Sequence, residues 1–396
     1  MNAPLSLEEA HGRLFALARR VDAFGAETIA VEDASGRYLA LALEARRTQP
    51  AHDLSIMDGF AVAGPGPWRI IGEARAGVPF AGALASGDSV RISTGAACPA
   101  GTESIVVRES AEVRDANLHA APPKDSWIRR KGFDFTAGDS LLEPGTLMGP
   151  GQIALALAAG HGSIEVARQP LVAIIECGDE LSADPADPHP DRIPASNGAM
   201  VAAMVLGAGG RVRRVGPLPD DRAALALAIR DAADADLVVT TAGASVGDHD
   251  HAGGALADLG AEVAFWRVAI RPGRPLMVAS LERQIVLGLP GNPASSYVTA
   301  FLFLLPLLRA LQGARSPLPG PVRLPLAAPL PHGGERREFW RARFSAGQAE
   351  PLFERDSSAL RTLALADLLI DRSAGAPPAQ SGEPVDCHWL ERGGAA

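Results

Sequence analysis

The stretch LVAIIECGDE, residues 171–180, decides the fold of the central part of the chain. Its apolar, β-branched residues are typical of a strand that is buried on both faces. The run stops at Gly178, directly before the carboxylates of Asp179 and Glu180. Strand and helix patterns alternate from here to residue 312, which predicts βαβ units and a parallel sheet covered by helices on both faces.

Two further strand patterns in this region also end in loops of small or polar residues. The first of these loops follows strand 237–241, and it combines small residues suited to an oxyanion with two acids: Gly243, Ser245, Gly247, Asp248 and Asp250. The second loop begins with Pro290-Gly291-Asn292-Pro293, followed by Ser295. It lies at the start of an apolar helix whose first N–H groups are free to bind an anion.

Each of these loops also has a simpler explanation. Acids that follow strands often cap helices or are merely solvated, and Pro293 suits the first turn of any helix. However, the carboxyl ends of parallel strands meet at one edge of the sheet, where open sheets bind their ligands. The clustering of the three loops therefore favours a ligand site at this edge.

The bulk composition excludes several classes of protein. With 396 residues, 47% of them hydrophobic, the chain is long enough for about three or four domains. The net charge of −9, without a long basic block, argues against a nucleic-acid surface. Three scattered cysteines have neither the spacing of a metal site nor that of a disulfide framework.

The sequence also predicts a cytoplasmic protein that does not bind membranes. Glu8 and Glu9 interrupt any apolar core of a signal peptide. The strongest apolar run, 301–311, contains Pro306 and Arg309 and is shorter than the roughly 20 residues that a bilayer span requires.

The pattern outside the central region predicts three further units. Ser6 and Glu9 form a capping box for a helix to about residue 20, and we expect this helix to pack beside a second one at 152–159. These helices would form a discontinuous helical linker domain, residues 1–24 and 139–168, with a β-rich domain, residues 25–138, inserted into it. The ligand domain would cover residues 169–315, and a small C-terminal β domain residues 316–396.

The motifs resemble those of the molybdopterin molybdotransferase family, which comprises MoeA-type proteins and the C-terminal part of gephyrin. The family patterns (S/T)GDEL, GG(V/A)SVGDxD and LPGNPxS correspond to the three loops in the same order. Further matches are MDGFAV at 57–62, STGA at 93–96 and RRKGFD at 129–134. The resemblance covers nearly the whole chain and implies the multidomain α/β and β architecture described above.

The resemblance implies an enzyme that inserts molybdenum from molybdate into adenylyl-molybdopterin, with Mg²⁺ as cofactor and release of AMP. It also implies a homodimer, because in the family the β-rich domain completes the pocket of the other subunit. Other proteins of molybdenum cofactor biosynthesis, or molybdoenzymes, are further expected partners. The pterin's sulfurs bind the metal, so the protein needs oxygen ligands for Mg²⁺ and loops for phosphate rather than a cysteine cluster.

The resemblance assigns roles residue by residue. The expected catalytic residues are Asp58, Thr94, Asp134 and Glu180, with Asp58, Glu180 and Asp250 as ligands of Mg²⁺. Arg271 and Arg274 take the place of two family lysines, and Arg336, Arg341 and Ser357 match residues of a molybdate site. The remaining binding residues come from the three loops: Gly178, Asp179, Gly243, Ser245, Gly247, Asp248, Pro290, Gly291, Asn292, Pro293 and Ser295.

The chain departs from the family pattern at several of these positions. The replacements are Phe133, Cys177, Ala195, Ala242 and Arg355-Asp356. The departures at Phe133, at Ala242 and before Ser357 leave open a non-catalytic, molybdopterin-binding or chaperone-like homologue. A second alternative is a pterin adenylyltransferase, because such an enzyme shares the ligand domain. Residues 1–168 argue against the second alternative, because that activity needs only the ligand domain.

Overall fold

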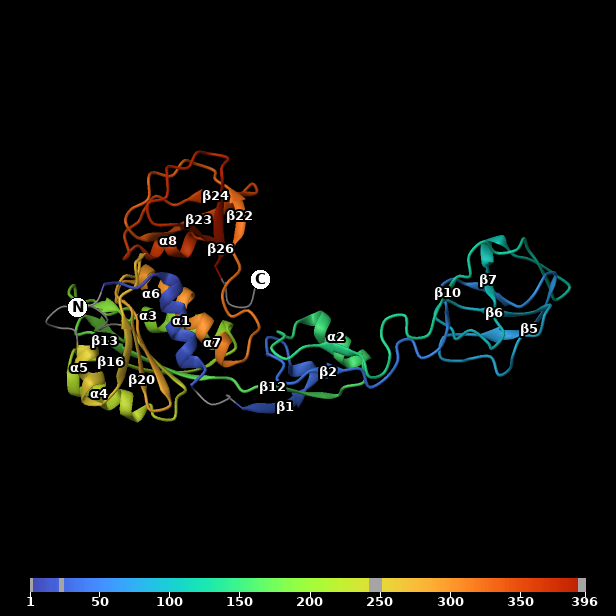
Figure 1. Cartoon of the computed structure of the whole chain (residues 1–396), viewed down its shortest axis with the longest axis horizontal. Helices are drawn as coiled ribbons and strands as arrows, with labels where there is room; N and C mark the ends of the chain where they lie inside the picture. The colour runs from blue at the N-terminus through green and yellow to red at the C-terminus, as the bar shows by residue number, and fades with distance from the viewer. Residues whose placement is uncertain (1–2, 21–24, 242–250, 391–396) are drawn as a thin grey trace.

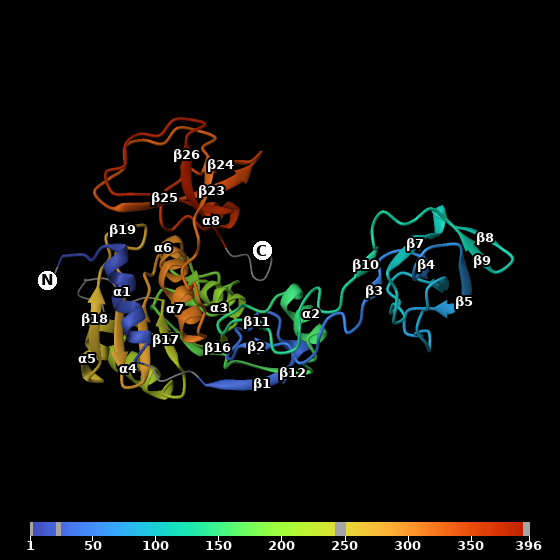
Figure 2. The ribbon, with the colours of Figure 1, turned by 45° about the vertical axis from the view of Figure 1, so that its right-hand side comes forward.

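The computed structural model describes residues 3–20, 25–241 and 251–390. The protein is elongated: a large α/β domain and the C-terminal β domain lie at one end, and a small middle domain connects them to a distal β domain (Figures 1 and 2). This arrangement confirms the multidomain α/β and β fold that the sequence predicted.

The α/β domain is built on a six-stranded sheet with the order β16-β13-β17-β21-β20-β18. Five strands run in one direction, whereas β20 is antiparallel to both of its neighbours. The prediction of a purely parallel sheet is therefore wrong at this edge. The strands are β13 (Leu171–Cys177), β16 (Arg211–Leu218), β17 (Leu237–Thr240), β18 (Glu262–Trp266), β20 (Met277–Leu281) and β21 (Gln284–Gly288).

Helices cover both faces of the sheet, as predicted. Val172 and Ile174 of β13 face one core, and Ala173 and Ile175 face the other, because successive side chains of a strand point to opposite sides. The first face carries α1 (Leu7–Ala18), α3 (Asn197–Gly207), α6 (Pro293–Thr299), the π-helix η3 (Ala300–Leu304) and α7 (Leu305–Leu311). The second carries α4 (Arg222–Asp231) and α5 (His251–Asp258).

The helical stretch Pro293–Leu311 is longer than the sequence suggested. It spans 19 residues with a mean hydropathy of 1.6, which would suffice to cross a membrane, but 83% of that window is buried inside the protein. It runs along the centre of the α/β domain against α1 and α3 (Figure 1). The stretch is therefore a core helix.

The first helix has the predicted capping box but not the predicted neighbour. The side chain of Ser6 accepts a hydrogen bond from Glu9 N, and the Glu9 carboxylate accepts one from Ser6 N. However, α1 packs against α7 and β18 of the α/β domain rather than beside the second helix. Its buried stripe, which includes Leu7 and Leu14, joins the core of the large domain, so the helix belongs there.

The middle domain contains the second predicted helix and pairs of short strands. Its core includes residues from the region 31–45 that the sequence had assigned to the β-rich insertion, such as Leu39 and Leu43, so that boundary is wrong. The domain consists of β1 (Ala26–Ala30) paired with β12 (Ser163–Ala167), η1 (Val31–Asp33), β2 (Leu43–Glu44) paired with β11 (Ser140–Leu142), and α2 (Pro150–Ala158).

The distal domain is a twisted β unit with two small cores, one on each side of its sheet. Its entry and exit strands, β3 (Leu54–Ser55) and β10 (Ile128–Arg129), pair with each other. The sheet has the order β7-β4-β6-β5-β9-β8. Its elements are β4 (Gly59–Val62), β5 (Trp68–Ala74), β6 (Asp88–Ile92), β7 (Ser104–Val107), η2 (Arg108–Ser110), β8 (Glu112–Arg114) and β9 (Asn117–His119).

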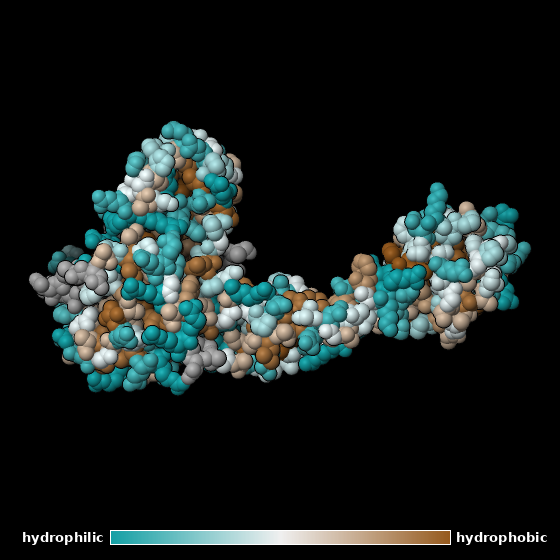
Figure 3. Space-filling view, viewed as in Figure 1, coloured by the Kyte–Doolittle hydropathy of each residue, from teal (hydrophilic) through white to brown (hydrophobic). Residues whose placement is uncertain are grey.

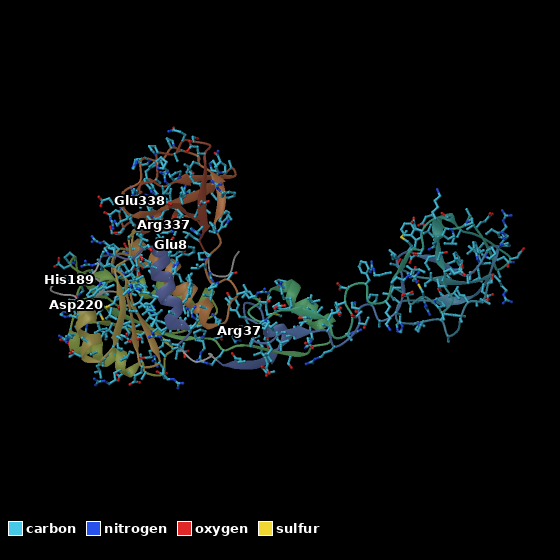
Figure 4. The ribbon with its side chains drawn as sticks, viewed as in Figure 1. Glu8, Arg37, His189, Asp220, Arg337 and Glu338 are labelled. Atoms are coloured by element: carbon cyan, nitrogen blue, oxygen red, sulfur yellow. The ribbon has the colours of Figure 1, made fainter. Side chains whose placement is uncertain are left out.

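The C-terminal β domain is joined to the α/β domain by strand pairing. Strand β19 (Ile270–Arg271), which comes from a loop of the α/β domain, pairs in parallel with β23. Arg337 of β23 also bonds to Glu8 of α1, and these residues meet at the junction in Figure 4. The domain contains β22 (Val322–Pro325), β23 (Arg337–Ser345), β24 (Gln348–Pro351), α8 (Leu360–Leu365), β25 (Leu368–Arg372) and β26 (Pro384–Trp389).

Candidate active site

A cavity of about 1080 Å³ lies where the carboxyl edge of the sheet meets the C-terminal domain. Its walls come from the loops that follow β13, β19 and β21, and from the segment 355–360 before α8. A second cavity of about 740 Å³ lies at the junction of the α/β and middle domains, but Arg19 is the one charged residue that lines it in the part of the chain described. The first cavity contains the charged groups expected for chemistry on anions, so it is the candidate active site.

Strand β13 delivers Glu180 to this cavity. Gly178 allows the chain to turn there, because its φ of 155° is a conformation that residues with a side chain rarely adopt. The short strands β14 (Leu181–Ser182) and β15 (Ile193–Pro194) pair directly after it and fix the loop. Asp179, by contrast, accepts a hydrogen bond from Asp220 N outside the cavity, so its expected binding role is not supported.

A buried acid forms part of the floor of the cavity. Glu176, 2% exposed, accepts hydrogen bonds from Gly198 N at 2.8 Å and from the Arg214 guanidinium at 2.8 Å. Gly198 must be glycine, because a Cβ atom there would lie 2.1 Å from the same carboxylate. This contact fixes the start of α3 against the end of β13.

The Pro290–Pro293 loop lies between the sheet and the C-terminal domain. The Asn292 side-chain amide donates to Ser357 Oγ at 2.9 Å, and Ala294 N donates to Ser357 O at 2.9 Å. Because Ser357 Oγ accepts the amide proton, its own hydroxyl proton remains available to an anion in the cavity. Asn197 donates to Gly291 O and holds the loop from the other side. Ser295, at the start of α6, also lines the cavity, as predicted.

Three predicted arginines line the same cavity as Glu180. Arg271, Arg274 and Arg336 all line the cavity, and none of the residues described pairs with the side chain of Arg274. Burial, followed by the positive charges of Arg271 and Arg274, lowers the pKa of Arg336. The three guanidiniums are thus close enough to repel one another, and an anion bound between them would relieve this repulsion.

Arg341 has a different place from the one expected. Its side chain is 5% exposed and does not line the cavity. Its guanidinium donates to three main-chain oxygens, those of Glu354 at 2.6 Å, Asp356 at 3.0 Å and Ala359 at 3.1 Å. Arg341 therefore holds the loop that carries Ser357, and the prediction that it binds the ligand directly is not supported.

The remaining predicted catalytic residues lie in or next to the distal domain. Asp58 precedes β4 and accepts hydrogen bonds on Oδ1 from Thr94 N at 2.6 Å and Thr94 Oγ1 at 2.9 Å. The Thr94 N–H and then its hydroxyl lower the pKa of Asp58, so this exposed acid is ionised at neutral pH. Asp134 is exposed beyond β10, beside Phe133, which is 74% exposed. Within one chain, the distal domain, to which β4 belongs, is well separated from the α/β domain (Figure 2).

Five predicted residues lie outside the part of the chain described. They are Gly243, Ser245, Gly247, Asp248 and Asp250. In the part that is described, no three His, Cys, Asp or Glu side chains are grouped in a way that could hold a metal ion.

Several residues of the cavity were not predicted from the sequence. Thr241 continues directly from β17, so its position after a strand was an available signal. Other polar lining residues that were not predicted include Ser196, Asn197, Arg355 and Ser358. Of these residues, only Arg355 had been noted from the sequence, as a departure from the family pattern.

Comparison with known proteins agrees with this geometry along the whole chain. Three family models match it: the MoeA N-terminal region (domains I and II) at residues 5–160, a probable molybdopterin binding domain at 173–310, and the MoeA C-terminal region (domain IV) at 323–390. A molybdopterin molybdenumtransferase of Staphylococcus aureus is 30% identical over 97% of this chain and 95% of its own length. The chain belongs to the MoeA family.

Further relatives support this membership. A molybdopterin molybdenumtransferase from Nostoc is 34% identical over 71% of this MoeA-family chain and 68% of its own length. The crystal structure of a molybdopterin biosynthesis MoeA protein from Pyrococcus horikosii, 26% identical, superimposes with a TM-score of 0.80 over 98% of this chain and 100% of that one. Both the fold class and the expectation of a transferase of molybdenum cofactor biosynthesis are confirmed.

Proposed function

We propose that this transferase inserts molybdenum from molybdate into adenylyl-molybdopterin and releases AMP. The observation that carries the proposal is the cavity that Arg271, Arg274, Arg336, Glu180 and Ser357 line together. Both substrates are anions, and guanidiniums in a partly dry site bind oxyanions through charge-assisted hydrogen bonds.

The residues of the chain have separate tasks in this reaction. The arginines and Ser357 hold the oxyanion, and the N-terminal N–H groups of α6 add a partial positive charge beside it. The C-terminal domain and the Pro290–Pro293 loop enclose the cavity and exclude water, which strengthens these interactions. Glu180 provides a carboxylate in the same cavity.

A magnesium ion fits this set of donors when the substrate contributes to its coordination. Mg²⁺ prefers oxygen ligands and usually keeps several waters and phosphate oxygens beside one or two carboxylates. Glu180 lines the cavity of one subunit, and in the proposed homodimer Asp58 of the partner subunit would supply the second carboxylate. When bound, the ion would neutralise charge on the pyrophosphate. Asp250, the third predicted ligand, lies outside the described residues.

The elongated shape supports the proposed homodimer. The distal domain, which carries Asp58, is well separated from the cavity of its own chain, so a second chain must bring an Asp58 to it. The middle domain also exposes the large hydrophobic side chains of Leu41, Leu147 and Leu157, and Figure 3 shows hydrophobic patches on the surface of this domain. Such residues suit an interface.

We further propose that the protein acts in the cytoplasm.

The activity is tested by AMP release from adenylyl-molybdopterin with and without molybdate. We expect release to depend on molybdate, to stop with chelator and to return with Mg²⁺. Binding of the pterin without any release would instead identify a non-catalytic binding protein. Formation of adenylyl-molybdopterin from ATP and molybdopterin would identify an adenylyltransferase.

The shared site is tested by mixing two inactive variants, Asp58→Asn and Glu180→Gln. In a mixed dimer one cavity retains both acids, so partial activity should return on mixing. Neither variant should regain activity when mixed with itself. If the mixture remains inactive although light scattering shows dimers, the two acids do not act in one site across subunits.

A further inference from the structure

Arg355 lies on the cavity wall at a position that the family pattern does not assign to a cation. It precedes the loop residue Ser357 and lines the same cavity as Arg271, Arg274 and Arg336. Its guanidinium carbon lies 3.9 Å from the centroid of the Trp340 ring, and Nη2 donates to Glu338 Oε1 at 2.7 Å. Among residues 3–20, 25–241 and 251–390, its Nε and Nη1 groups have no hydrogen-bond partner.

The two residues that hold the Arg355 guanidinium are buried. Glu338 and Trp340 are 4% and 6% exposed, and Trp340 Nε1 donates to Glu338 Oε2 at 3.1 Å. Burial by itself would raise the pKa of Glu338, but the bonds from Arg355 and Trp340 hold it below its usual value. One carboxylate oxygen of Glu338 therefore accepts a hydrogen bond from the Trp340 indole, and the other accepts one from the Arg355 guanidinium.

The same carboxylate also reaches the opposite domain. Because β19 pairs with β23, Arg271 lies directly across from Glu338, and Arg271 Nη1 is 3.7 Å from Glu338 Oε1. One buried acid thus holds two guanidiniums, one from the α/β domain and one from the C-terminal domain. Both retain donors that are not used by Glu338.

The charged side chains that line the cavity favour the binding of an anion. Among the described residues, four arginines line the cavity against Glu176, Glu180 and Asp356. Glu176 is already bonded to Arg214, and the Asp356 carboxylate accepts from Ser358 N and Oγ. Glu338 offsets part of the charge of Arg271 and Arg355, but all four guanidiniums keep N–H donors that can bind an oxyanion.

We propose that Arg355 binds the tetrahedral oxyanion substrate in this cavity, and that Glu338 and Trp340 are the positioning residues that aim its guanidinium. The inference rests on the proposed function and adds to it a residue specific to this chain. It predicts that the binding of molybdate depends on the planar, forked shape of Arg355 as well as on its charge.

The test compares full-length variants in molybdate-dependent AMP release at saturating adenylyl-molybdopterin. Arg355→Gln should raise the KM for molybdate about 10- to 100-fold, the effect of losing a charge-assisted hydrogen bond, with a much smaller change in kcat. Arg355→Lys should recover only part of this loss. Glu338→Gln, which keeps an acceptor for Trp340, should raise the KM by a smaller factor, because Arg355 is then held less firmly.

Arg343→Gln is the matched control, because Arg343 is an exposed residue of β23 outside the cavity and its loss changes the net charge equally. An active enzyme in which Arg355→Gln and Arg343→Gln share the wild-type KM would overturn the inference and leave the proposed function intact. If the wild type releases no AMP, the proposed function fails. Calorimetry with molybdate alone then decides the inference: weaker binding by Arg355→Gln supports it, and equal or no binding by both proteins overturns it.

Discussion

His11 Nε2 lies 2.8 Å from the main-chain oxygen of Leu302, four residues before Pro306. In an α-helix this oxygen would accept a hydrogen bond from residue 306, but proline has no N–H to donate. A carbonyl oxygen can only accept, so His11 Nε2 carries the proton of this bond. The imidazole also packs on Phe303, with the ring centroids 5.0 Å apart. The side chain of α1 therefore replaces a donor that the core helix lacks.

The burial of the His11 side chain predicts that stability falls in mild acid. Burial lowers the pKa of His11 below its ordinary value of 6.5. The unfolded chain then binds more protons than the folded one below about pH 6.5, so stability is lost as the pH falls through that region. Between pH 7.5 and 5.5, we expect the melting temperature of His11→Gln to fall by about 2–4 °C less than that of the wild type.

Glutamine is the appropriate replacement, because its amide can still donate to Leu302 O but does not titrate in this range. Calorimetric melting at the two pH values measures the difference. Equal shifts in both proteins would show that His11 does not contribute to the acid sensitivity.

The position of α1 also shows where sequence reasoning reaches its limit. The capping box at Ser6 and Glu9 and the apolar stripe predicted the helix and its buried face. They could not identify its partner, because any apolar surface would satisfy such a stripe. The helix packs on a sheet that begins about 150 residues later, which only tertiary structure reveals.

The reversed strand β20 was missed for a local reason. It forms a hairpin with β21 through the two residues Glu282 and Arg283, and Glu282 has φ of 51°. Such turns are normally marked by Asn-Gly or Asp-Gly, and no such pair occurs here. In the site, the strand-end positions of Glu180 and Asn292 were predictable. Arg341 was expected to bind the ligand but holds the loop 354–359, and Arg355, noted only as a departure from the family pattern, lines the cavity, because the pattern does not encode the conformation of this loop.

Thr94 is expected to act through Asp58. Its N–H and hydroxyl both bond to Asp58 Oδ1, and the N–H contributes more to the lowered pKa. Thr94→Val keeps the N–H, so Asp58 should stay ionised at neutral pH but lose part of its orientation. We expect about a 10-fold loss of kcat in AMP release, the lower range for a misplaced group. Thr94→Ser, which keeps the hydroxyl, should remain near the wild type. Equal activity of the valine and serine variants would contradict this role.

Arg341 is expected to act through the loop that carries Ser357. Lysine at this position keeps the charge, but one ammonium group cannot replace a fork that reaches three main-chain oxygens. Arg341→Lys should cost about 1–3 kcal/mol of stability and speed hydrogen exchange at residues 354–359. Ser357→Ala is the control: it should raise the KM for molybdate without faster exchange. Unchanged exchange in Arg341→Lys would show that the loop does not depend on the fork.

Arg274 provides the most direct test of anion binding, because its side chain lines the cavity without a partner among the residues described. Arg274→Ala should weaken the binding of molybdate or of the pterin ligand by about 1.5–3 kcal/mol, the range for a lost charge-assisted hydrogen bond. Lysine should restore most of this loss, since the family pattern that the sequence resembles has lysine here, which suggests that a point charge suffices. Arg211→Ala, which removes an exposed arginine of β16 that does not line the cavity, controls for net charge. Calorimetry with each ligand measures the affinities. Equal affinities of Arg274→Ala and Arg211→Ala would show that Arg274 is only a solvated residue of a surface turn and does not bind the anion.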